Sequence, residues 1–315
     1  MSEIRIETER NDYCGGEQVK GKVVIELDQP LPARGVRVTF LGQERCFWAD
    51  GFSRNQTTHL HTKEHVDEAL TLWGKPPLAI TEVLRDAVKG MFSKNAFEVL
   101  DAGTHDYPFT FDLPKNLPGD YESRRGSSIR YELHAELDVP LKIDLEVRKR
   151  LAVHEKPTTD EAGDEPASAR ATLELEGAPK LKLAAEVGRS TFRPGDQASC
   201  KVTIENGSSK PINGVTLLLR QVEDLVPKDV VFHNHDDFEL AKEGQPDISQ
   251  GEPAELAFDF QLPDKLYATI KAGALVNVRY ELVVQVDLPW ARSPELAVPI
   301  VVVEDPGKPS GGVAS

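Results

Sequence analysis

The chain repeats one pattern of residues in its two halves. The segment Tyr-Cys-Gly-Gly-Glu at residues 13–17 returns as Phe-Arg-Pro-Gly-Asp at residues 192–196, which is 179 residues later. A second pair of segments, Phe-Thr-Phe-Asp-Leu-Pro at 109–114 and Phe-Asp-Phe-Gln-Leu-Pro at 258–263, is 149 residues apart. The first copy therefore carries 30 extra residues (179 − 149) between the two segments. A period of this length is the size of a domain and exceeds the roughly 20–50 residues of a solenoid repeat.

Apolar and polar residues alternate through most of the chain, which is typical of antiparallel strands with one buried face. Turn residues such as Pro194-Gly195 and Asn213-Gly214 separate these runs. We predict an all-β fold of two tandem, immunoglobulin-like antiparallel β-sandwiches. The apolar positions that support this prediction are Val19, Val23, Ile25, Val36, Val38, Phe40, Ile129, Tyr131, Leu133, Val215, Leu217, Leu219, Tyr280, Leu282 and Val284.

The same pattern suggests where the domains begin and end. We expect the first sandwich in residues 1–154 and the second in residues 171–305. The acidic segment 155–170 between them has no large apolar residue, so it cannot offset its ordering entropy by burial and is expected to be a flexible linker. The last segment, 306–315, is rich in glycine, proline and serine and is expected to be a disordered tail.

The extra residues of the first copy contain a helical pattern. They predict one amphipathic helix at about residues 79–93, inserted in the N-terminal sandwich, with its apolar stripe on Ile80, Val83, Leu84, Ala87, Val88, Met91 and Phe92. We expect the stripe to pack on the outer face of that sandwich. The alternatives are a ligand for a groove in a partner and an anchor on a membrane surface. The polar face carries both signs of charge and suits lipid less well than a basic face, so any membrane contact is expected to be peripheral.

Charge and cysteine content exclude several classes of protein. The formal net charge of −15 argues against nucleic-acid binding and against general adsorption to anionic lipid. The three cysteines, Cys14, Cys46 and Cys200, form neither a disulfide framework nor a zinc spacing. No apolar run approaches the roughly 20 residues of a membrane-spanning helix, and the first residues lack the apolar core of a signal peptide. We therefore expect a cytoplasmic protein.

The sequence offers little for chemistry and more for binding. It has no Gly-x-Ser-x-Gly elbow and no phosphate-binding loop, so we expect no enzymatic activity, no catalytic residues and no cofactor. Trp48 and Phe52 lie where the strand alternation breaks, and both are candidates for partner-binding anchors because aromatic side chains dominate interface energies. The alternative is that they pack beneath the predicted helix.

Two segments are rich in histidine. His59, His61 and His65 lie in the first half, and His233 and His235 occupy a comparable position in the second. Histidines separated by one residue share one face of a strand. The alternative function is therefore a metal-binding or ligand-binding module that uses both segments. Solvated histidines are the simpler interpretation, and we assign no metal ligand.

The duplicated pattern resembles the arrestin fold family. In the second half, the motif at 192–196 is followed by Asn-x-Ser-x-Lys at 206–210 and by Arg-Gln at 220–221, in the order typical of arrestin C-terminal domains. In the first half, Ser-Ile-Arg-Tyr-Glu-Leu at 128–133 is similar to the alpha-arrestins. The resemblance covers nearly the whole chain. It implies two arrestin-type sandwiches that act as a non-enzymatic adaptor or scaffold and bind protein partners through their surfaces.

Two features of the family's eukaryotic members are missing. Receptor-binding arrestins sense phosphate with an arginine four positions before the residue that matches Arg148, where this chain has Asp144. Alpha-arrestins recruit ubiquitin ligases through Pro-Pro-x-Tyr motifs, whereas the Pro-Pro pair at 76–77 is followed by Leu78 and Ala79. These departures predict a prokaryotic or otherwise reduced member of the fold.

Overall fold

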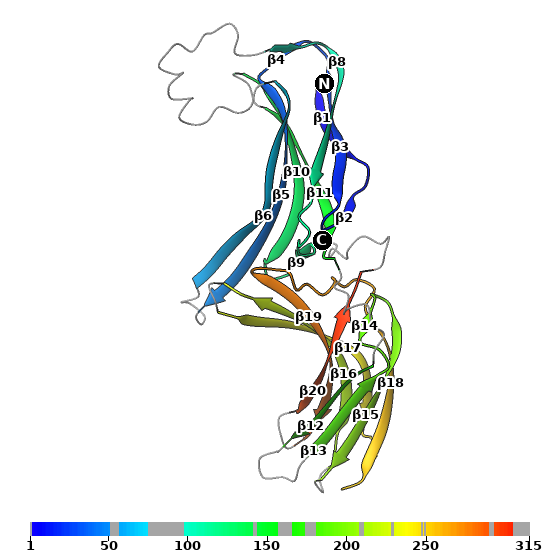
Figure 1. Cartoon of the computed structure of the whole chain (residues 1–315). Coiled ribbons are helices and arrows are strands. Elements are labelled where there is room, and N and C mark those ends of the chain that lie inside the picture. The colour runs from blue at the N-terminus through cyan, green and yellow to red at the C-terminus, as the bar shows by residue number, and fades with distance from the viewer. Residues whose placement is uncertain are drawn as a thin grey trace. The chain divides into compact units, whose positions relative to one another are not determined.

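The computed structural model describes residues 2–50, 57–74, 98–140, 144–156, 166–173, 181–207, 211–227, 230–246, 248, 250–289 and 293–304. The regular structure of these residues consists of β-strands, and the prediction of an all-β fold is confirmed (Figure 1). The helix predicted at 79–93 lies outside the described residues, and so does the predicted tail at 306–315.

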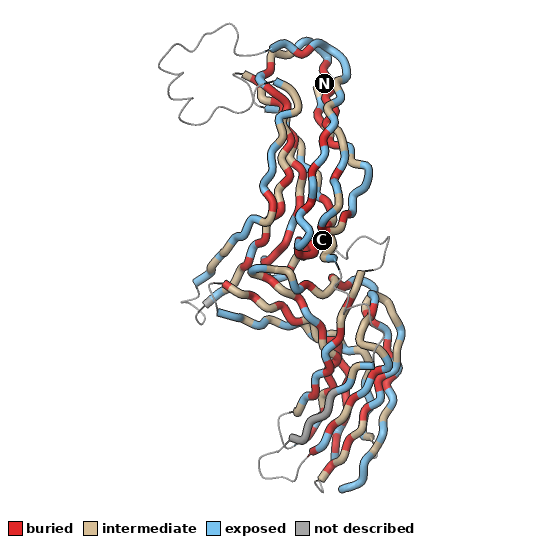
Figure 2. The backbone as a smooth tube through the Cα atoms, viewed as in Figure 1, coloured by how far each residue is buried: buried red, intermediate tan, exposed pale blue. Residues whose placement is uncertain are grey.

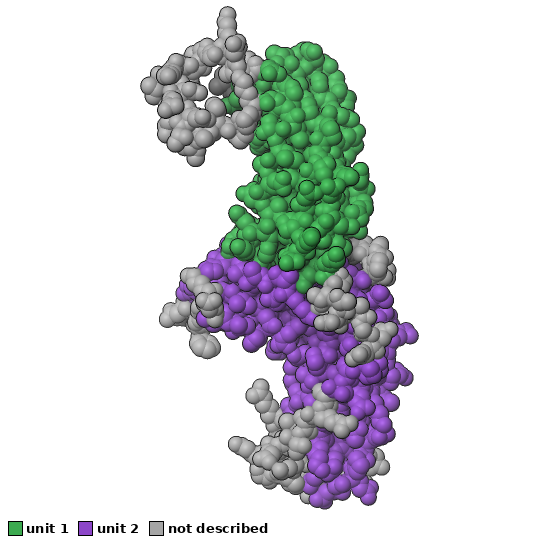
Figure 3. Space-filling view, viewed as in Figure 1, with its two compact units in different colours: residues 1–45, 62–120, 128–156 green, residues 46–61, 121–127, 157–315 purple. Residues whose placement is uncertain are grey.

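The chain divides into two compact units, which are coloured separately in Figure 3. Unit 1 consists of Met1–Arg45, Thr62–Asp120 and Ser128–Lys156. Unit 2 consists of Cys46–His61, Tyr121–Ser127 and Pro157–Ser315. Two short segments from the first half of the sequence, Cys46–His61 and Tyr121–Ser127, therefore belong to the same unit as the second half.

The strands of the first half form two main sheets and a small one. One sheet contains β1 (Glu3–Thr8), β3 (Gln18–Leu27) and β8 (Gly103–Asp112), in that order. The other runs in the order β2 (Asp12–Cys14), β11 (Leu145–His154), β10 (Ser128–Asp138), β5 (Gly35–Asp50) and β6 (Thr57–Gly74), with β9 (Tyr121–Glu122) beside β10. The small sheet pairs β4 (Leu31–Ala33) with β7 (Glu98–Leu100).

The second half repeats this arrangement. One sheet has the order β12 (Ala167–Leu173), β13 (Leu181–Val187), β15 (Gln197–Asn206) and β18 (Pro253–Gln261). The other has the order β14 (Thr191–Phe192), β20 (Glu295–Val302), β19 (Val276–Asp287), β16 (Gly214–Leu225) and β17 (Phe232–Gly244). β12 starts inside the segment that we expected to be a linker. β12 pairs with β13 along seven positions, so the backbone hydrogen bonds of a sheet order a stretch that has few large apolar residues.

Both sandwiches are built on the alternation seen in the sequence. Along β10, burial alternates so that Ile129, Tyr131, Leu133, Ala135 and Leu137 are fully buried. Figure 2 shows the same alternation of buried and exposed positions along the other strands. Each fully buried large apolar side chain contributes about 1.5–3 kcal/mol by its removal from water.

The duplicated motif forms the same turn in both sandwiches. Gly16 and Gly195 adopt positive φ angles of 86° and 81°, which glycine tolerates and which strain other residues. The amide of Gly16 donates to the carbonyl oxygen of Pro114 at 3.0 Å, and that of Gly195 donates to the carbonyl oxygen of Pro263 at 3.1 Å. Each turn follows a short strand, β2 or β14, that runs parallel to the last strand of its sandwich.

The acidic residue at the end of the motif, Glu17 or Asp196, accepts a hydrogen bond across the turn. Glu17 accepts a hydrogen bond from the amide of residue 14 at 2.8 Å, and Asp196 accepts one from the amide of residue 193 at the same distance. Arg10 and Arg189 donate to these two carboxylates at 3.1 and 2.9 Å. The bond from the residue 14 amide is the main reason that the pKa of Glu17 is lowered. The repeated sequence motif therefore forms a turn that holds the short strand, β2 or β14, beside the last strand of its sandwich.

A buried tyrosine is a second repeated device. The hydroxyl of Tyr131 donates to the carbonyl oxygen of Pro118 at 2.8 Å. The hydroxyl of Tyr280 lies 2.8 Å from the carbonyl oxygen of Tyr267, which is the equivalent position in the second half. Each bond connects a core strand to the chain 13 residues earlier. This arrangement is similar to the tyrosine corner of immunoglobulin-like sandwiches.

Candidate functional site

Trp48, one of the two predicted partner-binding residues, lies near the end of β5 in the part of this strand that belongs to unit 2. Its ring stacks on His59 with 4.9 Å between centroids and meets His61 edge-on at 5.6 Å, both from β6. It also stacks on Phe232 of β17 at 6.1 Å. The indole is only half-buried, so part of it stays accessible. Phe52, the other predicted anchor, lies outside the described residues.

We call Trp48, His59, His61, Phe232, Val230 and Val231 the aromatic surface. Val230 and Val231 lead directly into β17 and are 52% and 49% exposed, which is unusual for large apolar side chains. Exposed apolar residues that are grouped together mark interaction sites more often than isolated ones do. Aromatic residues at such places supply much of the binding energy in protein–protein interfaces. The arrangement is therefore suited to holding apolar side chains of another molecule.

The histidines have separate neighbours. His59 and His61 lie against Trp48, whereas Nε2 of His65 is 2.8 Å from the carboxylate of the fully buried Glu44. In the second half, Nδ1 of His233 is 2.6 Å from Asp224. Within the described ranges, no group of three or more His, Cys, Asp or Glu residues could hold a metal ion. The structure therefore gives no support to the metal-binding module that was the alternative interpretation.

An ion pair holds the Tyr121–Ser127 segment on β17. The guanidinium of Arg125 binds both carboxylate oxygens of Asp236, at 2.8 and 2.9 Å, and donates to the carbonyl oxygen of His235 at 3.1 Å. The bond from Arg125 lowers the pKa of Asp236. At the other end of the segment, the hydroxyl of Ser127 accepts a hydrogen bond from the amide of Phe47 at 3.0 Å. These bonds fix the segment to its neighbours in unit 2.

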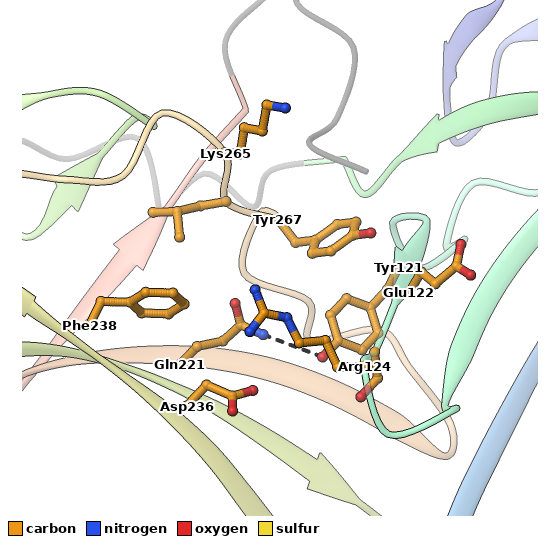
Figure 4. A pocket seen from close by; sticks show the side chains of 10 residues that line it. Tyr121, Glu122, Arg124, Gln221, Asp236, Phe238, Lys265 and Tyr267 are labelled. Carbon is orange, nitrogen blue, oxygen red and sulfur yellow. Dashed lines mark hydrogen bonds between the residues drawn. The ribbon is translucent and has the colours of Figure 1, made fainter. Parts of the chain in front are cut away.

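A pocket of about 280 Å³ lies beside this ion pair (Figure 4). The rings of Tyr121 and Tyr267 meet edge-on at 4.8 Å, and Phe238 of β17 adds a third aromatic wall. The side-chain amide of Gln221 donates to the hydroxyl of Tyr121 at 3.3 Å, the bond dashed in Figure 4. The full lining consists of Tyr121, Glu122, Ser123, Arg124, Gln221, Asp236, Phe238, Lys265, Leu266 and Tyr267, and all of these residues belong to unit 2.

Beneath the pocket lies a buried polar cluster. The hydroxyl of Tyr280 is 3.0 Å from the side-chain oxygen of Gln221. Glu223 is 2% exposed and accepts a hydrogen bond from the side-chain amide of Asn234 at 3.1 Å. Burial, followed by the nearby charge of Glu223, raises the pKa of Tyr121 well above its ordinary value. Gln221 thus connects the hydroxyls of Tyr121 and Tyr280.

The sequence indicated Trp48, His59 and His61 of this region but not the pocket. Trp48 was selected because the strand alternation breaks there. His233 and His235 were also noted, although it is the adjacent Asp236 that makes the inter-segment bond. A signal was present: adjacent arginines at 124–125 and adjacent aspartates at 236–237 are a complementary pair of segments. Nothing in the sequence alone showed that the two segments meet. Asp144 accepts a hydrogen bond from the backbone amide of Val139 at 2.7 Å.

Comparison with known proteins agrees with the fold. The family "Arrestin (or S-antigen), N-terminal domain" matches residues 2–159, and "Arrestin (or S-antigen), C-terminal domain" matches residues 179–306. Two tandem sandwiches with these matches define a protein of the arrestin fold. The chain belongs to the arrestin family.

Several curated relatives carry arrestin domains. Arrestin domain-containing protein 17 of Caenorhabditis elegans is 25% identical over 241 residues, which cover 74% of this chain and 54% of that protein. Arrestin domain-containing protein A of Dictyostelium discoideum is 21% identical over 317 residues, covering 95% of this chain and 50% of that protein. Human arrestin domain-containing protein 5 is 24% identical over 311 residues, which cover 92% of this chain and 84% of that protein. The chain thus spans about half the length of the first two relatives and most of the third. No helix within the described residues is long and apolar enough to cross a membrane.

Proposed function

We propose that this chain is a non-enzymatic, cytoplasmic adaptor that binds a protein partner through the aromatic surface. The observation that carries the proposal is the packing of Trp48 against Phe232, two residues far apart in the sequence, next to the exposed Val230 and Val231. Membership of the arrestin family supports an adaptor role. Cys46 and Cys200 are buried, and neither forms a disulfide within the described residues, which suits a reducing compartment.

The geometry supports protein binding better than catalysis or small-molecule binding. The partly exposed indole of Trp48 and the half-exposed Val230 and Val231, which precede Phe232 in the sequence, offer contact area to another surface. Trp is among the residues that most often dominate binding energy. The proposal does not include ligase recruitment, because the Pro-Pro pair at 76–77 is not followed by x-Tyr.

The proposal is tested with tagged protein and a lysate of the native host, with bound proteins quantified by mass spectrometry. The variants are Trp48→Ala and, as a matched control, Val99→Ala, which removes a 58% exposed apolar side chain of β7 outside the aromatic surface. We expect one stoichiometric partner that the wild type and the control retain and that Trp48→Ala loses by at least about tenfold, since truncation of a binding hot spot costs about 2 kcal/mol or more. Thermal unfolding of each variant checks that it is folded.

Two results would count against the proposal. A partner that all three proteins bind equally would show that the aromatic surface is not the binding site. Failure of the wild type to retain any stoichiometric protein would argue against the adaptor role itself.

A further inference from the structure

The pocket beside the Arg125–Asp236 ion pair has a composition that the aromatic surface does not share. Its walls are the rings of Tyr121, Tyr267 and Phe238. In Figure 4 the Lys265 ammonium and the Asp236 carboxylate lie at opposite ends of the view, and the three rings lie between them. Its volume of about 280 Å³ is just below the roughly 300–1,000 Å³ of pockets that hold drug-sized ligands. The space therefore suits one aromatic side chain better than a whole cofactor.

The charged residues that line the pocket indicate which groups a ligand would carry next to its aromatic side chain. Arg124 and Lys265 are both exposed, and neither forms a hydrogen bond or ion pair with another described residue. The carboxylates at the pocket are already engaged: Arg125 binds both oxygens of Asp236, and Glu122 also has an interaction partner. Within the described part of the chain, Arg124 and Lys265 are thus the charged groups of the pocket lining without a hydrogen-bonded or ion-paired partner, although the charge of Arg124 also acts on Asp236. Basic side chains that no described carboxylate binds are complementary to an acidic ligand.

The polar groups of Gln221, Tyr121 and Tyr280 favour an uncharged aromatic ring over a negatively charged group in the pocket. The side-chain oxygen of Gln221 faces the hydroxyl of Tyr280, and its amide donates to the hydroxyl of Tyr121. Burial and, after it, the charge of Glu223 raise the pKa of Tyr121, so a second negative charge beside this ring would be unfavourable. Aromatic rings, in contrast, gain from edge-to-face and stacked contacts with the walls.

We propose that this pocket receives one phenylalanine or tyrosine side chain of a protein partner, and that Arg124 and Lys265 bind acidic residues on either side of it. The proposal rests on the adaptor function proposed above and adds a second point of contact, with a stated chemistry, to the aromatic surface. The partner would thus present a short acidic segment with an aromatic residue at its centre.

Binding is measured by fluorescence polarisation with the full chain and the fluorescein-labelled peptide Glu-Glu-Phe-Glu-Glu. Three comparisons separate the possible sources of affinity: a peptide with alanine in place of phenylalanine, a peptide with lysine in place of each glutamate, and competition by inorganic phosphate. The protein variants are R124A/K265A and the charge-matched control K20A/K242A, which removes two exposed lysines away from the pocket.

We expect saturable binding of the acidic phenylalanine peptide, loss of binding for the other two peptides, and no displacement by phosphate at millimolar concentration. R124A/K265A should bind about fivefold more weakly, since each exposed charge pair contributes a fraction of a kcal/mol, while the control stays within about twofold of the wild type. The affinity should fall when salt is raised from 0.1 to 0.5 M, because exposed charges are screened.

Several results would overturn the proposal. They are no saturable binding up to about 1 mM peptide, equal binding by R124A/K265A and the wild type, and displacement by phosphate alone, which would show a plain anion site. Peptide binding that is lost in Trp48→Ala but kept in R124A/K265A would move the peptide to the aromatic surface and leave the adaptor function standing. Failure of the adaptor function itself is read separately, from the absence of any captured partner in the lysate experiment.

Discussion

The two buried tyrosine hydroxyls allow one interaction to be measured twice in the same molecule. Tyr131→Phe removes a hydroxyl 2.8 Å from the carbonyl oxygen of Pro118 and adds no cavity larger than one oxygen atom. The carbonyl is left buried without its donor, which costs about 1–3 kcal/mol. Tyr280→Phe removes the bond to the carbonyl of Tyr267 and also the contact of 3.0 Å with Gln221, so two polar groups lose a neighbour and the cost should be the larger of the two.

The assay is differential scanning calorimetry of the full chain, supported by urea unfolding followed by circular dichroism. A loss of 1 kcal/mol lowers the midpoint of a unit of 150–250 residues by about 2–4 °C, so each variant should unfold about 2–12 °C lower in one transition. Tyr107→Phe is the control: Tyr107 is half-buried on β8, and its hydroxyl forms no hydrogen bond with the residues that the structure describes. It should change stability by less than about 0.5 kcal/mol. The reasoning is refuted if Tyr280→Phe costs no more than this control.

Three further predictions follow from the same structure. Gly195→Ala should destabilise by about 1–2 kcal/mol in urea unfolding, because the residue has a φ angle of 81°; an unchanged midpoint would show that the turn can change conformation. Burial raises the pKa of Tyr131 and Tyr280, so the stability that these residues contribute is complete below about pH 10. This contribution is lost at higher pH, where the unfolded chain releases protons that the folded chain keeps. The free energy of unfolding of the double phenylalanine variant should therefore fall less steeply with pH above about pH 10, and an identical slope would contradict this. A double-mutant cycle of Arg125→Ala and Asp236→Ala should give a coupling free energy of about 0.5–1 kcal/mol, since the pair is bidentate but more than one-third exposed. Because the pKa of Asp236 is lowered, this coupling should be present above about pH 4 and should decline as the pH falls further.

The fold was largely predictable from the sequence because the alternation of apolar and polar residues along a strand depends only on which face of that strand is buried. A residue such as Val38 or Leu133 shows that one face of its strand is buried, and the duplicated segments show that the second half repeats the first. The turn at Pro194-Gly195 was also predictable, since proline and glycine are common turn residues. The extent of β12 was not, because sheet pairing rather than its own apolar content orders it.

The candidate site was only partly predictable because it is formed by contacts between distant segments. Trp48 could be selected from the break in alternation, but nothing local showed that Phe232 lies against it. Arg125 and Asp236 are 111 residues apart, and each looks like an ordinary surface charge. A pattern along one strand shows which face is covered but not by what, so the pocket required the structure.

The placement of Cys46–His61 and Tyr121–Ser127 in unit 2 has a consequence for synthesis on the ribosome. Both segments are translated long before β16 and β17, which supply Gln221, Phe232 and Asp236 as their neighbours. The first half of the chain must therefore leave the ribosome while Trp48 and Tyr121 lack those contacts. The contacts form only after β16 and β17 have been synthesised. A chain stalled before residue 214 would present these aromatic side chains to chaperones, which bind exposed apolar surface of incomplete folds.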